Sequence, residues 1–313
     1  GEDIKDYFFH LDNSPTHSFM RGLYKYPHAA FPYERLVDEN GRRSRLEPEY
    51  ELVDTGIFDE SRYFDIFVEY AKAGPDDLCI RIRTINRGPD PALLIVLPTL
   101  WFRNTWAWGE VGAVKPKMHL GSQGTVVARP WEMPEYELCA EGNSEWIFTE
   151  NETNTSRLFG SPNASPYVKD AFHEYVVSGH SEAVNPEHYG TKAAALYRRN
   201  LAPGEEWTIQ LRLRHPSRGA PFDETFHETF EIREAEVSAF YEQSSPGLPN
   251  ETALVSQRSL AGLLWCKKFY FYSVMRWLTG DPTMPPPPPE RWHGRNTFWR
   301  ELNAHNVISM PDS

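Results

Sequence analysis

Residues 63–100 read YFDIFVEYAKAGPDDLCIRIRTINRGPDPALLIVLPTL, and this stretch decides the expected fold. Apolar and polar side chains alternate over residues 63–71 and again over residues 78–86, which is the pattern of half-buried strands. The turn sequence GPDD joins the two segments, and a second turn precedes the more apolar residues 92–100. Strands connected by short turns in this way predict an antiparallel meander.

The same pattern of short strands and turns continues along the chain. We expect further strands at residues 111–120, 125–129, 136–140, 146–149, 157–160, 175–179, 192–196 and 207–213. Together these exceed the roughly seven strands of an immunoglobulin-type sandwich. The sequence therefore predicts a mainly β fold with a large antiparallel two-sheet sandwich. Residues 1–62 have weak periodicity, and we expect irregular structure there.

The pattern changes to helical spacing after Pro216. Apolar residues recur at this spacing between residues 219 and 250, which predicts a linker helix. Residues 250–280 have a wider apolar surface, so we expect a longer helix that is buried in a helical layer. Five consecutive prolines follow at residues 285–289. They predict a stiff extended segment, which is either a spacer within a loop or a docking site for a binding domain.

The composition limits the class of partner. The 313 residues include 44 acidic and 32 basic side chains, for a net charge of −12, which argues against nucleic acid and anionic membranes as partners. Three cysteines are too few for a disulfide framework, and their odd number fits a reducing cytoplasm. No apolar run approaches the ~18 residues of a membrane-spanning helix, and the N-terminus has no signal-peptide pattern. We therefore expect a cytoplasmic protein without a metal or cofactor.

Residues 97–109 read LPTLWFRNTWAWG and place three tryptophans around an arginine and an asparagine, directly after an apolar run. Indole rings can cover the apolar faces of a sugar, while guanidinium and amide groups bind its hydroxyls. The tryptophans could equally be core residues or an interdomain interface, where aromatic residues and Arg are enriched. Residues 291–296 (RWHGRN) form a second cluster of this kind. The candidate sugar-contacting residues are Trp101, Arg103, Asn104, Trp106, Trp108, Arg295 and Asn296.

Carboxylates that could act in catalysis are harder to identify. Asp65 and Glu69 resemble a pair, but they alternate with core residues on a strand, and we expect them to face solvent. Glu110 and Glu132 are the nearest candidate carboxylates to the tryptophan cluster along the chain, and an active enzyme would require two carboxyl groups at catalytic separation near that cluster. Nucleophile signatures, Gly-rich phosphate loops and paired Cys ligands are missing. We therefore assign no catalytic residue.

Residues 58–72 (FDESRYFDIFVEYAK), 97–109 and 258–312 resemble the bacterial glucosidase-like members of glycoside hydrolase family 63. This family includes mannosyl-oligosaccharide glucosidases and relatives that act on mannosylglycerate or glucosylglycerate. The resemblance implies a super-β-sandwich over residues 1–218, a helical linker over residues 219–250 and the start of a truncated (α/α)6 barrel over residues 251–313. It also implies inverting hydrolysis of α-glycosidic bonds by two carboxylic acids of the barrel, which lie beyond the end of this sequence.

Two functions fit these observations. The chain is expected to be the non-catalytic sandwich and linker portion of an α-glycoside hydrolase, which supports the barrel and walls the sugar pocket. The alternative is a free-standing carbohydrate-binding or scaffolding protein without hydrolytic activity. The expected partners are an α-linked oligosaccharide or glycosylglycerate-type sugar, and a helical catalytic domain or a second copy of the chain. The helix at residues 250–280 discriminates between the two, because a self-sufficient module should bury it.

Overall fold

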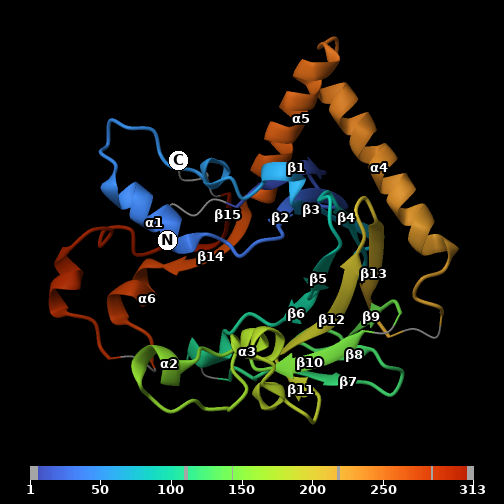
Figure 1. The fold of residues 1–313 in the computed structure, drawn as a ribbon. Helices are drawn as coiled ribbons and strands as arrows, with labels where there is room; N and C mark the ends of the chain where they lie inside the picture. The colour runs from blue at the N-terminus through green and yellow to red at the C-terminus, as the bar shows by residue number, and fades with distance from the viewer. Residues whose placement is uncertain (1–5, 109–111, 143, 217–218, 283–284, 309–313) are drawn as a thin grey trace. The chain divides into compact units, whose positions relative to one another are not determined.

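The computed structural model describes residues 6–108, 112–142, 144–216, 219–282 and 285–308 (Figure 1). The fold is mainly β, with large antiparallel sheets and a few helices, as the sequence predicts. The chain divides into two compact units. Unit 1 comprises Gly1–Val96, Cys139–Ser144 and Leu196–Gly262, and unit 2 comprises Leu97–Leu138, Glu145–Ala195 and Leu263–Ser313. The domain boundaries expected near residues 218 and 250 stay a prediction.

The principal sheet of unit 1 contains the predicted meander. Its strands lie in the antiparallel order β1 (Phe8–Asn13), β2 (Phe19–Pro27), β3 (Tyr63–Gly74), β4 (Asp77–Asn86) and β13 (Glu206–Arg214). The β3–β4 hairpin turns at residues 75–76, where the sequence has its GPDD signal. One sheet face contributes Phe64 to a core that also contains Leu94 of β5 (Ala92–Val96) and Leu201 of β12 (Lys192–Leu201).

The expectation of irregular structure over residues 1–62 is wrong for β1 and β2. β2 pairs with β1 on one side and with β3 on the other. These backbone hydrogen bonds keep the segment in a strand although its apolar and polar residues alternate little. Gly22 permits this pairing, because the Phe8 ring lies where a side chain would stand. The rest of this region forms α1 (Tyr33–Arg42) and the 3₁₀ turns η1 (Leu52–Thr55) and η2 (Asp59–Ser61).

Unit 2 contains shorter strands and small helices. β9 (Tyr136–Ala140), β8 (Val126–Arg129), β7 (Lys117–Leu120) and β11 (Tyr189–Gly190) are neighbours in that order. β12 pairs with β6 (Thr99–Trp101) through its first residues and lies beside β10 (Glu145–Thr149). The chain crosses between the units within β9 and β12.

Two strands expected in unit 2 are helices instead. Residues 157–160 belong to α2 (Thr155–Phe159), which begins because the Asn154 side chain accepts a hydrogen bond from the Arg157 amide. Residues 175–179 overlap α3 (Ala171–Val177), which is followed by the 3₁₀ turn η4 (Ser181–Ala183). α3 buries Phe172 against Ile147 and Ala194. Residues 111–120 form a strand only from residue 117, and residue 111 lies outside the described residues.

The linker helix expected between residues 219 and 250 is present as α4 (Glu224–Ser244). It contacts the face of the unit 1 sheet opposite Phe64, where Phe226, Phe230 and Val237 pack against Phe19 and Cys79. Burial raises the pKa of the Cys79 thiol to about 11, which fits a structural role.

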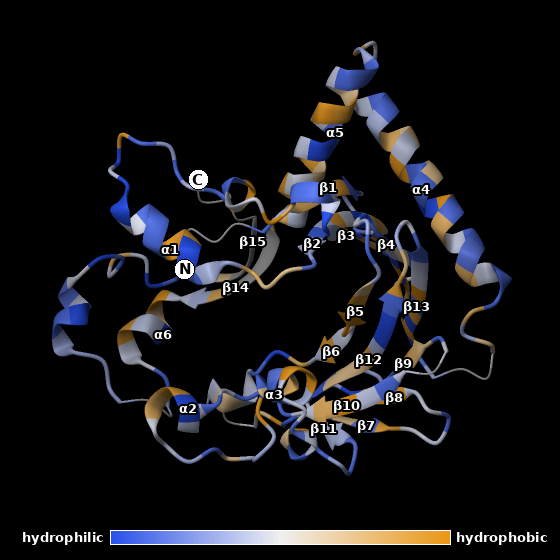
Figure 2. Cartoon of the chain, in the orientation of Figure 1, coloured by the Kyte–Doolittle hydropathy of each residue, from blue (hydrophilic) through white to orange (hydrophobic). Residues whose placement is uncertain are grey.

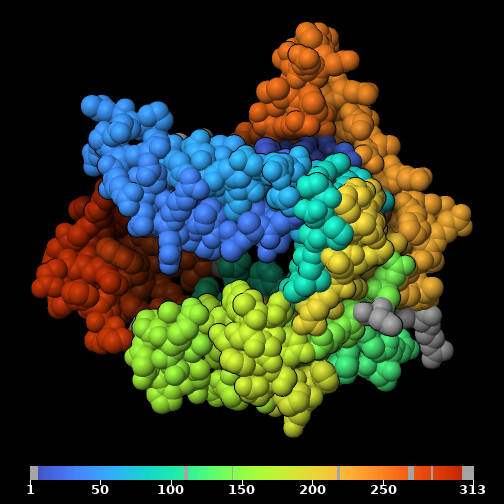
Figure 3. All heavy atoms as spheres, viewed as in Figure 1, coloured from blue at the N-terminus to red at the C-terminus, as the bar shows by residue number. Residues whose placement is uncertain are grey.

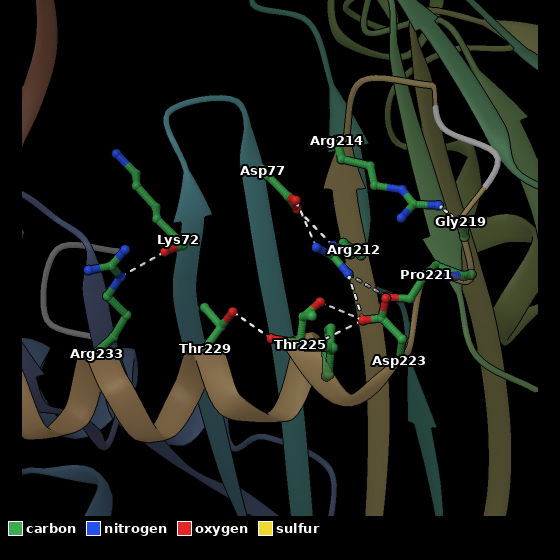
Figure 4. Close-up of polar contacts among 11 residues, drawn as sticks. Lys72, Asp77, Arg212, Arg214, Gly219, Pro221, Asp223, Thr225, Thr229 and Arg233 are labelled. Atoms are coloured by element: carbon green, nitrogen blue, oxygen red, sulfur yellow. Dashed lines mark hydrogen bonds and ion pairs between the residues drawn. The ribbon is translucent and has the colours of Figure 1, made fainter.

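Polar contacts hold α4 to the sheet (Figure 4). Arg212 of β13 donates two 2.8 Å hydrogen bonds to Asp77, a 3.0 Å bond to the Pro221 carbonyl and a 3.5 Å bond to Asp223, the N-cap of α4. Further along the helix, Arg233 Nε donates a 2.8 Å bond to the Lys72 carbonyl. The linker helix is therefore fixed at its start and along its length.

The single long helix expected at residues 250–280 is wrong. The segment forms α5 (Asn250–Trp265), β14 (Lys267–Ser273) and α6 (Val274–Thr279), and β14 pairs with β15 (Asn303–Ile308). Residues 267–273 read KKFYFYS, and aromatic residues favour strands when a partner strand is available. Short apolar runs do not distinguish a buried strand from a helix by periodicity alone.

α5 leaves much of its apolar surface uncovered. Leu254, Val255 and Leu260 are exposed, Val255 by 65%, and Ala261 is the one fully buried residue of this helix among those described. Figure 2 shows apolar segments along both α4 and α5. In the space-filling view (Figure 3), atoms of both α4 and α5 are visible from the side shown. Within the described residues, no helix is both long and apolar enough to span a membrane.

Candidate functional site

Unit 2 contains a hollow of about 430 Å³ that aromatic and charged side chains line. We call it the aromatic–arginine hollow. The rings come from Trp108, Phe271, Tyr272 and Trp277, and the charges from Arg276, Asp281 and Arg291. Such a lining has an apolar body and a few fixed polar groups, which is typical of a small-molecule site.

Local sequence signals position α6 beside this hollow. Ser273 ends β14 and caps α6, because its hydroxyl accepts a hydrogen bond from the Arg276 amide. Gly280 ends the helix with a φ of 85°, a conformation that glycine adopts without strain. A side chain at Gly280 would also meet Pro287 Cδ at 2.7 Å. The short helix therefore turns sharply at Gly280, and Pro287 packs directly on that turn.

Arg276 connects three parts of the hollow. Its Nε donates a 2.5 Å hydrogen bond to Asp281, and its Nη2 donates a 3.1 Å bond to the Trp108 carbonyl. The guanidinium lies 5.4 Å from the Trp108 ring centre and 5.8 Å from that of Phe271. These two rings are themselves 5.1 Å apart. Cation–π attraction and the hydrogen bonds together fix the position of Arg276.

Arg291 supplies the second guanidinium from the 3₁₀ turn η5 (Pro289–His293). Its Nη1 donates a 2.7 Å hydrogen bond to the Trp277 carbonyl, and the group lies 5.1 Å from the Trp277 ring centre. A guanidinium has five N–H donors. Asp281 is the one carboxylate among the described lining residues, whereas two guanidinium groups line the hollow, so its described lining has a net positive charge. This balance suits a ligand that is rich in oxygen acceptors.

The structure divides the predicted tryptophan cluster. Trp108 lines the hollow, whereas Trp106 of η3 (Trp106–Trp108) donates a 3.1 Å hydrogen bond to Glu152. Trp101 is 57% exposed at the end of β6. Three indoles that are close in sequence therefore have three different surroundings.

The remaining candidates differ in their distance from the hollow. Asn296 donates a 3.2 Å hydrogen bond to the hydroxyl of Tyr272, which is a lining residue. Asn104 accepts a 3.3 Å bond from the Ala107 amide and so stabilises its own turn. Arg103 and Arg295 are exposed and do not line the hollow.

Sequence reasoning missed most of the lining residues. Arg276, Trp277 and Asp281 fall within or just after the segment assigned to one long helix, so their side chains were not considered together. The residues RWLTGD at 276–281 combine an arginine, an indole and a carboxylate around a helix-ending glycine. That combination is the signal that could have identified the hollow.

Asp65 and Glu69 do not face solvent, and that expectation is wrong. They are 5% and 4% exposed. The strand register places Lys25 opposite Asp65, and it places Arg21 and Arg81 on either side of Glu69. Lys25 binds Asp65 at 2.8 Å, and Arg81 binds Glu69 at 2.6 Å. Buried charges that are paired in this way stabilise a fold, so these carboxylates are structural.

Two carboxylates were expected near the tryptophans, Glu110 and Glu132. Glu110 lies outside the described residues. Glu132 is exposed in a loop and does not line the hollow. Within the described part of the chain, no group of three or more His, Cys, Asp or Glu residues is placed to hold a metal ion.

Comparisons with known proteins identify a relative that is much longer than this chain. No family model matches it. It is 36% identical over 360 aligned residues to the uncharacterized protein YMR196W of Saccharomyces cerevisiae, an alignment that covers 100% of this chain and 33% of the yeast protein. The chain thus spans about a third of the length of this curated relative.

Similarity to solved structures is low. A putative aldose 1-epimerase from Escherichia coli K12 has a TM-score of 0.29 and 9% identity, and covers 66% of this chain and 67% of its own. A galactose mutarotase related enzyme from Lactobacillus acidophilus has a TM-score of 0.26 and 8% identity, and covers 67% of this chain and 71% of its own. At these scores the two structures support no conclusion about this chain.

Proposed function

We propose that the chain binds carbohydrate in the aromatic–arginine hollow without cleaving it. The observation that carries this proposal is the lining itself, whose described residues supply four aromatic rings, two guanidinium groups and one carboxylate. Ring faces favour the apolar C–H surfaces of a sugar, and guanidinium N–H groups favour its oxygens.

The same lining argues against hydrolysis at this site. Inverting glycosidases use two carboxyl groups about 6.5–9.5 Å apart, one as acid and one as base. Asp281 is the one carboxylate among the described lining residues, and it already accepts a hydrogen bond from Arg276. We therefore assign cleavage to another part of a longer protein.

We further propose that the chain is the super-β-sandwich and linker portion of a family 63-like α-glycoside hydrolase, and that residues 251–313 begin its (α/α)6 barrel. The uncovered apolar residues of α5 support this view, because a self-sufficient module should bury them. The greater length of the yeast relative is consistent with further helices that would cover α5. A cytoplasmic location, expected from the cysteine content, belongs to the same proposal.

A free-standing sugar-binding protein is the second candidate. The observation in its favour is that all lining residues of the hollow belong to unit 2. The site therefore requires no additional domain to form its lining.

The test combines a binding measurement with a cleavage assay. The purified chain is titrated with α-glucosides and α-mannosides, including mannosylglycerate, while its tryptophan fluorescence is recorded. Release of free monosaccharide is measured on the same samples. We expect a saturable fluorescence change for at least one sugar and no release above the blank. Release above the blank would contradict the non-catalytic role, and a panel without any saturable change would contradict sugar binding.

A further inference from the structure

The proline tract at residues 285–289 carries a feature that sugar binding does not explain. Pro285, Pro286, Pro288 and Pro289 are exposed, and Pro287 is half-buried. Consecutive exposed prolines form a stiff apolar ridge on the surface of this acidic protein. A spacer that only closed a loop would not require this regular division between exposed and half-buried rings.

The sequence itself dictates the backbone of this tract. The proline ring fixes φ near −65°, and a following proline restricts ψ to extended values. Residues 285–288 are each followed by proline, so they must adopt polyproline II geometry. Pro288 has a φ of −56° and a ψ of 138°, as this argument requires. Pro289 precedes Glu290 instead, and there η5 begins.

Polyproline II has three residues per turn, so the tract has three edges. Pro285 and Pro288 share one edge, and Pro286 and Pro289 share the next. Pro287 lies on the third edge, and its ring packs on Gly280, where a built side-chain carbon would be 2.7 Å from Pro287 Cδ. The protein therefore holds the tract by one edge and exposes the rings of the other two, of which Pro285 also lines the open hollow.

Two exposed edges are what a polyproline-binding groove engages. Aromatic-lined grooves of domains of the SH3 class bind Pro-x-x-Pro segments, because this helix is preformed and loses little entropy on binding. Pro286 and Pro289 have the required spacing. Arg291 follows two residues later, where it belongs to η5, lines the hollow and donates to the Trp277 carbonyl, so the proline rings alone are the contacts that the tract offers.

We propose that residues 285–289 form a docking segment for a polyproline-binding domain of the SH3 type, whose aromatic groove would hold the rings of Pro286 and Pro289. The proposal rests on the exposed edges of the tract, and it does not depend on sugar binding. The tract would then tether this protein to a partner that contains such a domain.

The test is isothermal titration calorimetry of the purified chain with an isolated SH3 domain that binds Pro-x-x-Pro ligands. We expect saturable 1:1 binding. Pro286→Ala and Pro289→Ala should each weaken it by at least about tenfold, because they remove rings that enter the groove. Pro287→Ala is the matched control, and it should change the affinity by less than about threefold, since this ring faces Gly280.

Circular dichroism melting of the variants verifies that each remains folded. Absence of binding at the highest soluble concentration would overturn the proposal. A Pro287→Ala variant that loses as much affinity as Pro286→Ala would also overturn it, because the tract would then not bind through its two exposed edges.

Discussion

Arginines and aromatic rings meet in two regions of this protein with opposite outcomes. On the α4-covered face of the unit 1 sheet, Arg81 lies 4.3 Å from the Phe230 ring centre and binds Glu69, and Arg212 binds Asp77. In the aromatic–arginine hollow of unit 2, Arg276 and Arg291 lie over rings in the same way, but Asp281 is the one carboxylate among the described lining residues.

The difference shows what separates a structural cluster from a binding site. In unit 1 these guanidinium groups are neutralised by carboxylates, and the rings are fully buried, so the cluster stabilises the sheet and helix. In unit 2 the described lining residues include two guanidinium groups and one carboxylate, and the rings line an open hollow. We therefore expect substitutions in the first region to change stability and substitutions in the second to change ligand affinity.

The largest effect should follow Phe230→Ala. This ring is 1% exposed and packs against Phe19 and Cys79 beneath α4, so its removal leaves a cavity. We expect a loss of about 3–5 kcal/mol in the free energy of unfolding, measured in urea. Phe240→Ala on the same helix is the control, because Phe240 is exposed, and it should cost less than about 1 kcal/mol. Equal costs would show that α4 is not anchored by its buried face.

Arg212→Met should have the next largest effect. The Arg212 side chain is 7% exposed and its substitution leaves Asp77 unpaired, which costs about 3 kcal/mol at the lower end of the range for buried pairs. Arg199→Met breaks the exposed pair with Glu205 and should cost less than about 1 kcal/mol. Urea unfolding of both variants gives the comparison. If both variants lose the same free energy of unfolding, the contacts of Arg212 with Asp77 and the start of α4 do not stabilise the fold more than an exposed ion pair does.

In the hollow, Arg291→Gln should weaken sugar binding with little effect on stability. Loss of a charged donor to a sugar oxygen should reduce the affinity roughly tenfold. Arg295→Gln is the matched control, since Arg295 is exposed and does not line the hollow. The affinity of this variant for the sugar should be unchanged. Fluorescence titration measures both. An equal loss in the two variants would shift the binding site towards the RWHGRN segment as a whole.

The smallest effect concerns Glu152, which accepts hydrogen bonds from Trp106 and Lys115, at acid pH. Burial acts to raise the pKa of Glu152, but hydrogen bonds from Lys115 and Trp106 outweigh it and hold this pKa below the ordinary value of 4.5. A carboxylate with a lowered folded pKa stabilises the fold above its unfolded pKa, and this contribution is lost as the pH falls through the folded pKa. Glu152→Gln should therefore reduce stability at neutral pH and flatten the acid decline below pH 4.5. Glu182→Gln, at an exposed position, should leave the pH profile unchanged.

Parts of the fold could be predicted where the pattern of side chains matches local geometry. Alternation over residues 63–86 predicted the β3–β4 hairpin, because one sheet face is apolar and the turn is strongly marked. The same alternation misled the interpretation of Asp65 and Glu69. A polar sheet face reads as solvent-exposed, but here cross-strand Lys and Arg side chains and the later helix α4 cover it.

The candidate site could be predicted only in part. Trp108 was identified because three indoles near Arg and Asn are conspicuous in sequence. Arg276 and Trp277 were missed, because β14 is fixed by pairing with β15, a strand distant in sequence, and no local period reveals this. The hollow exists because that pairing ends at Ser273 and α6 begins there.

Isothermal titration of the best-binding sugar into the chain and its Trp277→Ala variant tests the central claim most directly. Trp277 lines the hollow and lies under Arg291, whereas the exposed Trp131 is an indole of the same unit outside the lining. We predict that Trp277→Ala lowers the affinity by at least about tenfold, and that Trp131→Ala leaves it unchanged. Unchanged affinity in Trp277→Ala would contradict sugar binding in the aromatic–arginine hollow.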